Sequence, residues 1–358
     1  MSKVAKRSSH SDYEKFKEYL FEMHERALRV YRRLSSVRKE YLRSYFKENF
    51  KEAREHYWTL RKLYCLAMYI PMFLQIGTTY FKVIYVDTHA GPGLAKVGEG
   101  EDELVLGSPL LAIVWPEIVA SRNIYFKKIK KGFDALYFID IDSKAIDVLR
   151  EAVNYVTDDA KSWTSRIKFH VGDANDVLLS TVKGDIEKGF DKKKILVLMF
   201  IDPFGELESQ LRYDVFREFI ETFRTDVIFT VMSSSIARAL SSKNGEELRK
   251  WVKGLWGEIR ESDEGRRLSL CTFNEQGSRR VGVNDVVKAY KAVLEQRNYK
   301  VKVFEVTYGE KILYHLIVAS KGDEWLNGYE KYVRERTPRD YKTLKNLFLQ
   351  VRGKQAVL

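Results

Sequence analysis

The stretch VIYVDTHAGPG, residues 83–93, consists of a short apolar run that ends in Asp87 and a glycine-containing turn directly after it. Four further short apolar runs follow, with helical patterns between them: ALYFID (135–140), IKFHV (167–171), ILVLMFID (195–202) and DVIFTVM (226–232). Such runs, alternating with helices, are typical of parallel strands buried on both faces of a sheet. We therefore predict an α/β fold with a doubly wound, mostly parallel sheet.

Two later strand candidates, VKVFEVTY (301–308) and ILYHLIVAS (312–320), stand close enough in the chain to pair as an antiparallel hairpin. By analogy with known architectures, a parallel sheet that ends in such a hairpin is the arrangement of class I methyltransferases rather than of dinucleotide dehydrogenases. The expected fold is therefore Rossmann-like, of the class I methyltransferase type, with an N-terminal helical extension.

The chain divides by its patterns into three parts. Residues 1–80 have helical periodicity and an excess of basic residues, and residues 81–330 form the expected Rossmann-like domain, with a helical insertion at 233–297. Residues 331–358 are expected to form a basic C-terminal tail. No internal repeat or low-complexity run occurs, which excludes solenoid and collagen-like folds.

The net charge of +12 is concentrated at the two ends of the chain. Residues 1–62 carry 17 Lys and Arg against 9 Asp and Glu, and residues 331–358 carry 8 against 2. Basic ends on a neutral body favour attraction to the phosphates of RNA or DNA, although a solvated helical surface explains the charge equally well. Aromatic residues among the N-terminal charges favour nucleic acid slightly, because rings stack on bases, but at helical spacing such rings more often belong to a core.

The composition also excludes several classes of protein. The two cysteines, Cys65 and Cys271, allow neither a disulfide framework nor a cysteine-based zinc site, and no His, Asp and Glu residues have metal-ligand spacing. No segment approaches the roughly 20 apolar residues of a membrane helix, and the N-terminus lacks the apolar run of a signal peptide, so we expect a cytoplasmic protein without a membrane partner. No GxSxG or P-loop motif is present, which argues against a hydrolase or an NTPase.

The turn after the first strand predicts a cofactor site. Ligands of open α/β sheets bind beyond the carboxyl ends of the strands, and Gly91 and Gly93 would let the backbone approach one closely. The turn departs from the dinucleotide pattern GxGxxG, because Lys96 stands at the third glycine position. Since a site without a pyrophosphate needs fewer amide donors, this departure favours S-adenosylmethionine (SAM) over NAD. We expect Asp87, His89, Gly91 and Gly93 to line the SAM site.

Carboxylates that end the second and third strands extend this prediction. Asp140 can accept both ribose hydroxyls of a nucleoside, whereas its neighbour Asp142 is interpreted as the cap of the next helix. Asp173, in GlyAspAlaAsn at 172–175, either accepts the adenine amino group or caps the helix that follows. The motif alone does not separate these two roles for Asp173.

The fourth strand ends in AspProPheGly at 202–205, which predicts the catalytic residues. In the methylation of an exocyclic amine, a carboxylate and a backbone carbonyl accept the two amine protons, and an aromatic ring fixes the plane of the base. Asp202, the carbonyl of Pro203 and the ring of Phe204 suit these three roles. The structural alternative, a turn that closes a buried strand, explains Pro203 and the glycine but does not call for Asp beside Phe.

Seven motifs taken together resemble the three-Cys-motif partner proteins (TcmP). They are HisTyrTrpThrLeuArgLysLeu (56–63), TyrValAspThrHisAlaGlyProGly (85–93), GlySerProLeuLeuAla (107–112), PheIleAspIleAsp (138–142), GlyAspAlaAsn (172–175), PheIleAspProPheGly (200–205) and TyrHisLeuIleValAlaSer (314–320). The resemblance covers about residues 56–330 and implies a class I methyltransferase fold and a companion protein that carries three cysteines. The chain departs from the family at His89, where Phe is more usual, and in its long basic N-terminal helices.

AspProPheGly also resembles the catalytic motif of tRNA N2-guanine dimethyltransferases, which implies an exocyclic amine of a nucleic acid as the methyl acceptor. Three functions follow as hypotheses. The first is a SAM-dependent methyltransferase acting on nucleic acid. The second is a catalytically silent protein of the same fold that binds nucleic acid or a three-Cys-motif partner, and the third is a methyltransferase for proteins or small molecules.

Overall fold

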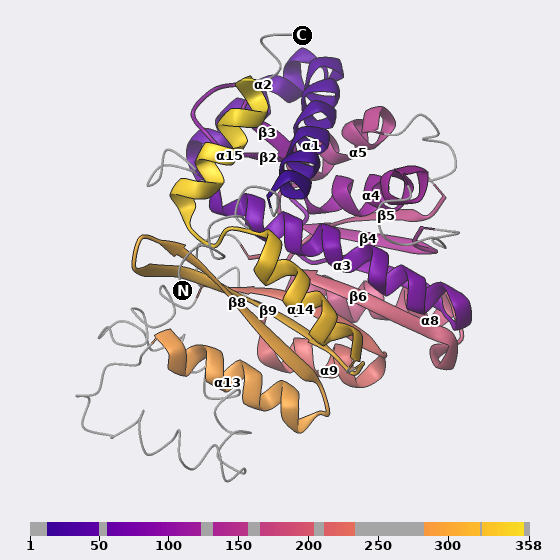
Figure 1. Cartoon of the computed structure of the whole chain (residues 1–358). Helices are drawn as coiled ribbons and strands as arrows, with labels where there is room; N and C mark the ends of the chain where they lie inside the picture. Colours follow the sequence, from indigo (N-terminus) through magenta and orange to yellow (C-terminus); the bar gives the residue numbers. More distant parts are fainter. Residues whose placement is uncertain are drawn as a thin grey trace, which may run out of the picture.

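The computed structural model describes residues 13–49, 56–122, 132–156, 165–203, 211–232, 283–322 and 324–353. Its central feature is a seven-stranded sheet with the order β5-β4-β1-β6-β7-β9-β8 (Figure 1). The strands are β1 (Lys82–Asp87), β4 (Ala135–Asp140), β5 (Ile167–Val171), β6 (Ile195–Ile201), β7 (Thr225–Val231), β8 (Lys300–Tyr308) and β9 (Lys311–Ser320).

The pairing of the strands confirms the predicted fold class. Strands β5, β4, β1, β6 and β7 run parallel, and β9 pairs antiparallel with both β7 and β8. The sheet is thus mostly parallel and ends in an antiparallel hairpin, as in Rossmann-like class I methyltransferases. Because β4 and β6 lie on either side of β1, the order of the strands reverses at β1, and ligands of such sheets bind beyond the carboxyl ends at this point.

Helices cover both faces of the sheet, and the alternation of side chains along each strand explains why. In β1, Val83 and Tyr85 face one core, whereas Ile84 and Val86 face the other. The first core includes side chains of α3 (Trp58–Tyr80), α4 (Ser108–Arg122), α5 (Ser143–Val156) and α14 (Glu324–Arg336). The second includes side chains of α7 (Ala174–Val177), α8 (Lys183–Gly189), α9 (Tyr213–Thr222) and α13 (Val283–Gln296).

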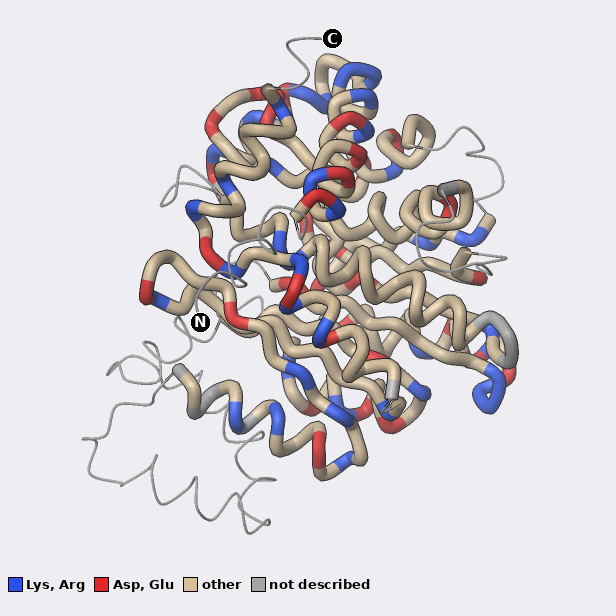
Figure 2. The backbone as a smooth tube through the Cα atoms, in the orientation of Figure 1, with Lys and Arg blue, Asp and Glu red and all other residues tan. Residues whose placement is uncertain are grey.

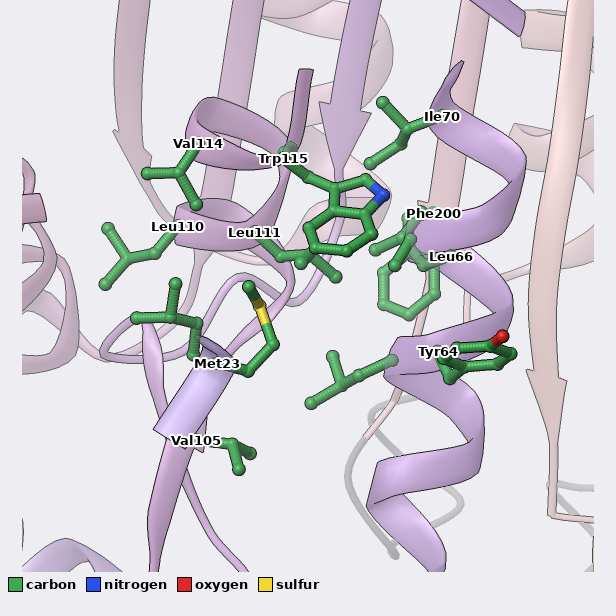
Figure 3. Packing of buried hydrophobic residues seen from close by; sticks show 14 of the residues in the cluster. Met23, Tyr64, Leu66, Ile70, Val105, Leu110, Leu111, Val114, Trp115 and Phe200 are labelled. Atoms are coloured by element: carbon green, nitrogen blue, oxygen red, sulfur yellow. The ribbon is translucent and has the colours of Figure 1, made fainter. Parts of the chain in front are cut away.

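The N-terminal helices α1 (Glu14–Arg33) and α2 (Ser36–Asn49) precede α3. Helix α1 is amphipathic, and its apolar face belongs to the first core. Figure 3 shows Met23 of α1 close to Leu110 and Leu111 of α4 and to β3 (Leu104–Leu106). Strand β3 pairs with β2 (Leu94–Lys96). The helical start of the chain is therefore packed onto the sheet domain.

The C-terminal residues differ from their prediction as a basic tail. Residues 331–336 complete α14, and α15 (Tyr341–Gly353) follows. Helix α15 buries Leu344, Phe348 and Val351 in the first core. The prediction weighted the charges of this segment and missed the apolar spacing beneath them, which is that of an amphipathic helix. Of the predicted insertion at 233–297, residues 233–282 lie outside the described residues, and α13 packs near the hairpin (Figure 1).

None of the helices in the described ranges is both long and apolar enough to cross a membrane. Of the two cysteines, Cys65 is buried and forms no disulfide, and Cys271 lies outside the described residues.

Candidate functional site

The topology brings three of the predicted site residues to one edge of the sheet. Asp87 ends β1, Asp140 ends β4, and Asp202 directly follows β6. In the register of the sheet, Asp87 is opposite Phe138 of β4 and Phe200 of β6. Three carboxylates, far apart in the sequence, thus lie at the carboxyl ends of three neighbouring strands.

The turn after β1 needs glycine at two positions, which differ in the space around them. Gly91 and Gly93 have φ of +59° and +79°, a region that side chains with a Cβ rarely adopt. A Cβ on Gly93 would lie 2.6 Å from Leu149 Cδ1 and 3.0 Å from Leu110 Cγ, so these side chains would have to shift, whereas one on Gly91 would approach only the Tyr45 hydroxyl, at 3.6 Å. The turn is held by the N–H of Gly107, which donates to the carbonyl of Gly93 at 2.7 Å.

Asp140 organises the turn. Its Oδ2 accepts a hydrogen bond from the N–H of Gly91 at 2.7 Å, and its Oδ1 accepts one from the N–H of Asp142 at 2.9 Å. Burial raises the pKa of Asp140, although both backbone hydrogen bonds oppose that rise. Each carboxylate oxygen has a second lone pair, so Asp140 can still accept two further hydrogen bonds from hydroxyl groups.

Two other acidic residues near the strand ends cap helices. Asp142 Oδ1 accepts from the N–H of Lys144 at 2.8 Å, which confirms its interpretation as the cap of α5. The exposed Asp173 caps α7, because its Oδ1 accepts from both the N–H of Asn175, at 2.8 Å, and the side-chain amide of Asn175, at 3.0 Å. These contacts are those expected if Asp173 caps the helix, and a contact of Asp173 with adenine stays a prediction.

Asp87 is fully buried at the end of β1. The Tyr85 hydroxyl donates to its Oδ2 at 3.2 Å, and the N–H of His89 donates to its Oδ1 at 3.3 Å. Burial raises the pKa of Asp87 to about 7; hydrogen bonding by Ser108 opposes that rise, and the charge of Asp202 adds to it. Within the described part of the chain, Asp87 forms no ion pair with a Lys, Arg or His.

His89 follows the buried Thr88, whose N–H donates to the carbonyl of Phe200 at 3.1 Å. The Thr88 hydroxyl lies 2.8 Å from His89 Nδ1, at hydrogen-bond distance. This contact holds the imidazole at the edge between β1 and β6, so His89 belongs to the same group of side chains as Asp87.

Asp202 forms an ion pair with Lys62 of α3, and both side chains are largely buried, with 16% and 13% of their surface exposed. Lys62 was not among the predicted site residues, although it belongs to the segment HisTyrTrpThrLeuArgLysLeu. Pro203 is buried beside Asp202. Phe204 lies outside the described residues, so its role stays a prediction.

Two tyrosines of α2 also reach this edge of the sheet. The Tyr41 hydroxyl donates to Asp142 Oδ2 at 2.5 Å, and the Tyr45 hydroxyl is the nearest group to the position of a Cβ on Gly91. They belong to the aromatic residues among the N-terminal charges, for which the sequence offered only base stacking or a place in a core. Their spacing of four residues places them on one face of the helix, which is the signal that could have grouped them.

Some of the basic residues at the two ends of the chain form ion pairs within the protein. Arg38 of α2 pairs with Asp147 and Glu151 of α5, and Arg352 of α15 pairs with Asp102 and Glu103. Lys and Arg are interspersed with Asp and Glu on α2 and α5 (Figure 2), whereas α15 carries basic residues and no acidic ones. Part of the terminal charge thus holds the helices in place. No group of three or more His, Cys, Asp and Glu in the described ranges could hold a metal ion.

No family model matches the chain, and no curated protein matches it either. A solved structure of a protein with family-model DUF519 from Legionella pneumophila is 10% identical, with a TM-score of 0.40 and coverage of 79% of this chain and 91% of that one. A putative O-methyltransferase from Klebsiella pneumoniae is 11% identical (TM-score 0.34; 86% and 90% covered). An rRNA methylase from Streptococcus thermophilus is 8% identical (TM-score 0.33; 71% and 94% covered). At these values the similarities do not assign a ligand or an activity, and the resemblance to TcmP stays a prediction.

Proposed function

We propose that the protein is a SAM-dependent methyltransferase whose cofactor binds at the carboxyl ends of β1 and β4. The observation that carries the proposal is Asp87, a fully buried carboxylate that forms no ion pair in the described structure and lies beside a glycine turn. The charged form of a buried carboxylate without an ion pair is costly unless a cation joins it. SAM brings such a cation, the ammonium of its methionine part, whereas the pyrophosphate of NAD would be repelled at this edge.

The other residues of the edge fit the same cofactor. Gly91 permits a close approach of the backbone, Gly93 gives the turn its positive φ, and the remaining lone pairs of Asp140 suit the two hydroxyls of a ribose. Bound SAM would supply a methyl group made electrophilic by the sulfonium. The protein's part is to hold the cofactor and to orient the acceptor.

Asp202, Pro203 and Phe204 are the residues that we assign to the acceptor. The ion pair with Lys62 engages Oδ2 of Asp202, which leaves Oδ1 to accept a proton of an exocyclic amine. The same ion pair also supports the second hypothesis, a catalytically silent protein that binds nucleic acid or a three-Cys-motif partner, because Lys62 competes with an acceptor for Asp202.

Two measurements test this proposal. Calorimetry with S-adenosylhomocysteine (SAH), which retains the ammonium and the ribose, should detect binding to the wild type. Mass spectrometry of nucleosides from RNA and DNA incubated with the protein and labelled SAM should then identify a methylated base. Binding of SAH without methyl transfer to any nucleic acid would favour the silent protein, and absence of SAH binding would refute the cofactor assignment.

The first variant to test is Asp140→Ala. We expect it to weaken SAH binding by about 1.5–3 kcal/mol, the cost of losing charge-assisted hydrogen bonds. Because Asp140 also holds the amides of Gly91 and Asp142, thermal unfolding of each variant should be followed alongside calorimetry. Asp140→Asn is the matched control, since it retains one acceptor and should lose less affinity. An unchanged affinity in folded Asp140→Ala would remove this residue from the site.

The nucleic-acid acceptor is tested through the dependence of binding on salt. We expect replacement of Lys3, Lys6 and Arg7 by Gln to reduce the slope of log affinity against log salt by about 0.9 for each phosphate that the variant no longer neutralises, as measured by gel shift. Lys183→Gln is the control, because Lys183 lies on α8 in an ion pair with Glu218. An equal slope in the triple variant and the wild type would show that these terminal charges do not bind phosphate.

A further inference from the structure

Helix α2 lies against the turn that carries Gly91, beside the candidate cofactor site. Tyr45 reaches the turn itself, because its hydroxyl would be 3.6 Å from a Cβ placed on Gly91. Burial raises the pKa of the Tyr45 phenol, and the charges of Asp140, Asp142 and Asp202 add to this effect. Tyr45 is therefore close to the carboxylates of the site as well as to the glycine turn.

A chain of hydrogen bonds connects α2 to Asp140. The Tyr41 hydroxyl donates to Asp142 Oδ2 at 2.5 Å, and the N–H of Asp142 donates to Asp140 Oδ1 at 2.9 Å. Asp140 in turn accepts the N–H of Gly91 at 2.7 Å. Tyr41 and Tyr45 are four residues apart, with ring centroids at 5.7 Å, so the contact at Tyr41 also fixes where Tyr45 lies.

The remaining contacts of α2 are mostly polar and near the surface. Arg38 pairs with Asp147 at 3.3 Å, and Arg43 pairs with Glu101 at 3.0 Å. Exposed ion pairs contribute little stability each. Only Leu42 and Phe46 are buried among the described side chains of the helix. Helix α2 is thus held by a small apolar contact and a set of polar ones.

We propose that α2 is a cover of the cofactor site, that Tyr45 contacts the bound cofactor, and that the hydrogen bond from Tyr41 to Asp142 holds the cover closed. This inference rests on the proposed function, because it takes the site to bind SAM. Asp140 is hydrogen-bonded to Asp142, which is in turn hydrogen-bonded to Tyr41 of α2. A ligand that binds Asp140 therefore acts on this chain of contacts. Cofactor binding and the closed position of α2 are therefore coupled.

The test measures SAH affinity of the full chain by calorimetry and amide hydrogen exchange of residues 36–49 without and with SAH. For the wild type we expect SAH to slow exchange in this segment. Tyr45→Ala should weaken SAH binding more than tenfold and Tyr45→Phe about threefold to tenfold, because the variants lose the whole side chain and the hydroxyl respectively. Tyr41→Phe should accelerate exchange in α2 without SAH.

Tyr308→Phe is the matched control, because this exposed tyrosine lies at the end of β8, and it should bind SAH as the wild type does. Thermal unfolding verifies that each variant is folded, and Tyr45→Phe retains the ring if Tyr45→Ala fails to fold. If Tyr45→Phe binds SAH as tightly as the wild type and Tyr45→Ala binds it more weakly, the contact with the cofactor is made by the ring of Tyr45, and the result still supports the cover.

The outcomes separate this inference from the proposed function. If the wild type does not bind SAH, the cofactor assignment fails and the cover fails with it. If the wild type binds SAH, but folded Tyr45→Ala binds it within twofold and SAH leaves exchange in α2 unchanged, only the cover is refuted. In that case Tyr41 and Tyr45 serve to pack α2 on the domain.

Discussion

Asp202→Ala is expected to lower methyl transfer at least about 100-fold and to leave SAH affinity within about threefold of the wild type. The physical reason is that Asp202 is assigned to the acceptor amine and would accept its proton only in the reacting geometry. The measurements are mass spectrometry of labelled nucleosides for transfer and calorimetry for SAH binding. The prediction applies to whichever nucleic acid the wild type methylates.

The ion pair with Lys62 determines the control for this experiment. Removal of Asp202 leaves the largely buried Lys62 without its partner, and breaking a buried pair in this way costs about 3–5 kcal/mol. The double variant Asp202→Ala, Lys62→Met removes both charges, so it should unfold at a higher temperature than Asp202→Ala and still be inactive. Transfer close to the wild-type level in the double variant would show that Asp202 serves only to neutralise Lys62.

The second large effect concerns Asp87. We expect SAH affinity to fall about tenfold between pH 8 and pH 6, because burial raises the pKa of Asp87 to about 7 and only the ionised carboxylate pairs with the ligand's ammonium. Asp87→Asn should bind SAH about 10-fold to 100-fold more weakly than the wild type at pH 8 and lose the pH dependence. Calorimetry over this pH range measures both.

The stability of the unliganded protein should respond to pH with the opposite sign. The folded protein holds the Asp87 proton up to a pKa of about 7, whereas the unfolded chain releases it near the ordinary value of 3.8. The contribution of Asp87 to stability is therefore fully present below pH 4 and is lost as the pH rises through 7. Asp87→Asn removes this loss, so thermal unfolding at pH 8 should occur at a higher temperature than in the wild type.

Asp226 supplies a matched control for Asp87. It is also buried, with its pKa raised to about 6 by burial, but it lies at the start of β7, at the opposite edge of the sheet, and accepts a hydrogen bond from Tyr69. Asp226→Asn should alter the pH dependence of unfolding and leave that of SAH affinity unchanged. If Asp226→Asn removed the pH dependence of binding as well, the effect would be a property of the fold rather than of the cofactor site.

Local patterns in the sequence were sufficient for the sheet and for the positions of its polar strand ends. A strand buried on both faces must be apolar along its length, so the apolar runs before Asp87, Asp140 and Asp202 were recognisable without a structure. The helix cap at Asp142 could be predicted because a cap bonds to amides two or three residues away. The cap at Asp173 was one of two alternatives, since the same short motif fits a ligand contact.

The contacts that define the candidate site join residues that are far apart in the chain. Lys62 pairs with Asp202 across 140 positions, and Tyr41 bonds to Asp142 across 101. The residues next to Lys62 and Tyr41 in the sequence give no indication of these partners. The role of Arg352 was likewise hidden, because an exposed arginine and one that pairs with Asp102 look the same in a sequence.

The sequence by itself determined the fold class, the order of the strand-ending motifs and the concentration of charge at the two ends. These properties follow from periodicity and composition, which act over a few residues. Only the tertiary structure decided that Asp87 is buried without an ion pair in the described part of the chain, that Lys62 occupies one oxygen of Asp202, and that α2 lies over the glycine turn. Those facts depend on which surfaces meet after folding, because desolvation and long-range pairing are set by the whole packed chain.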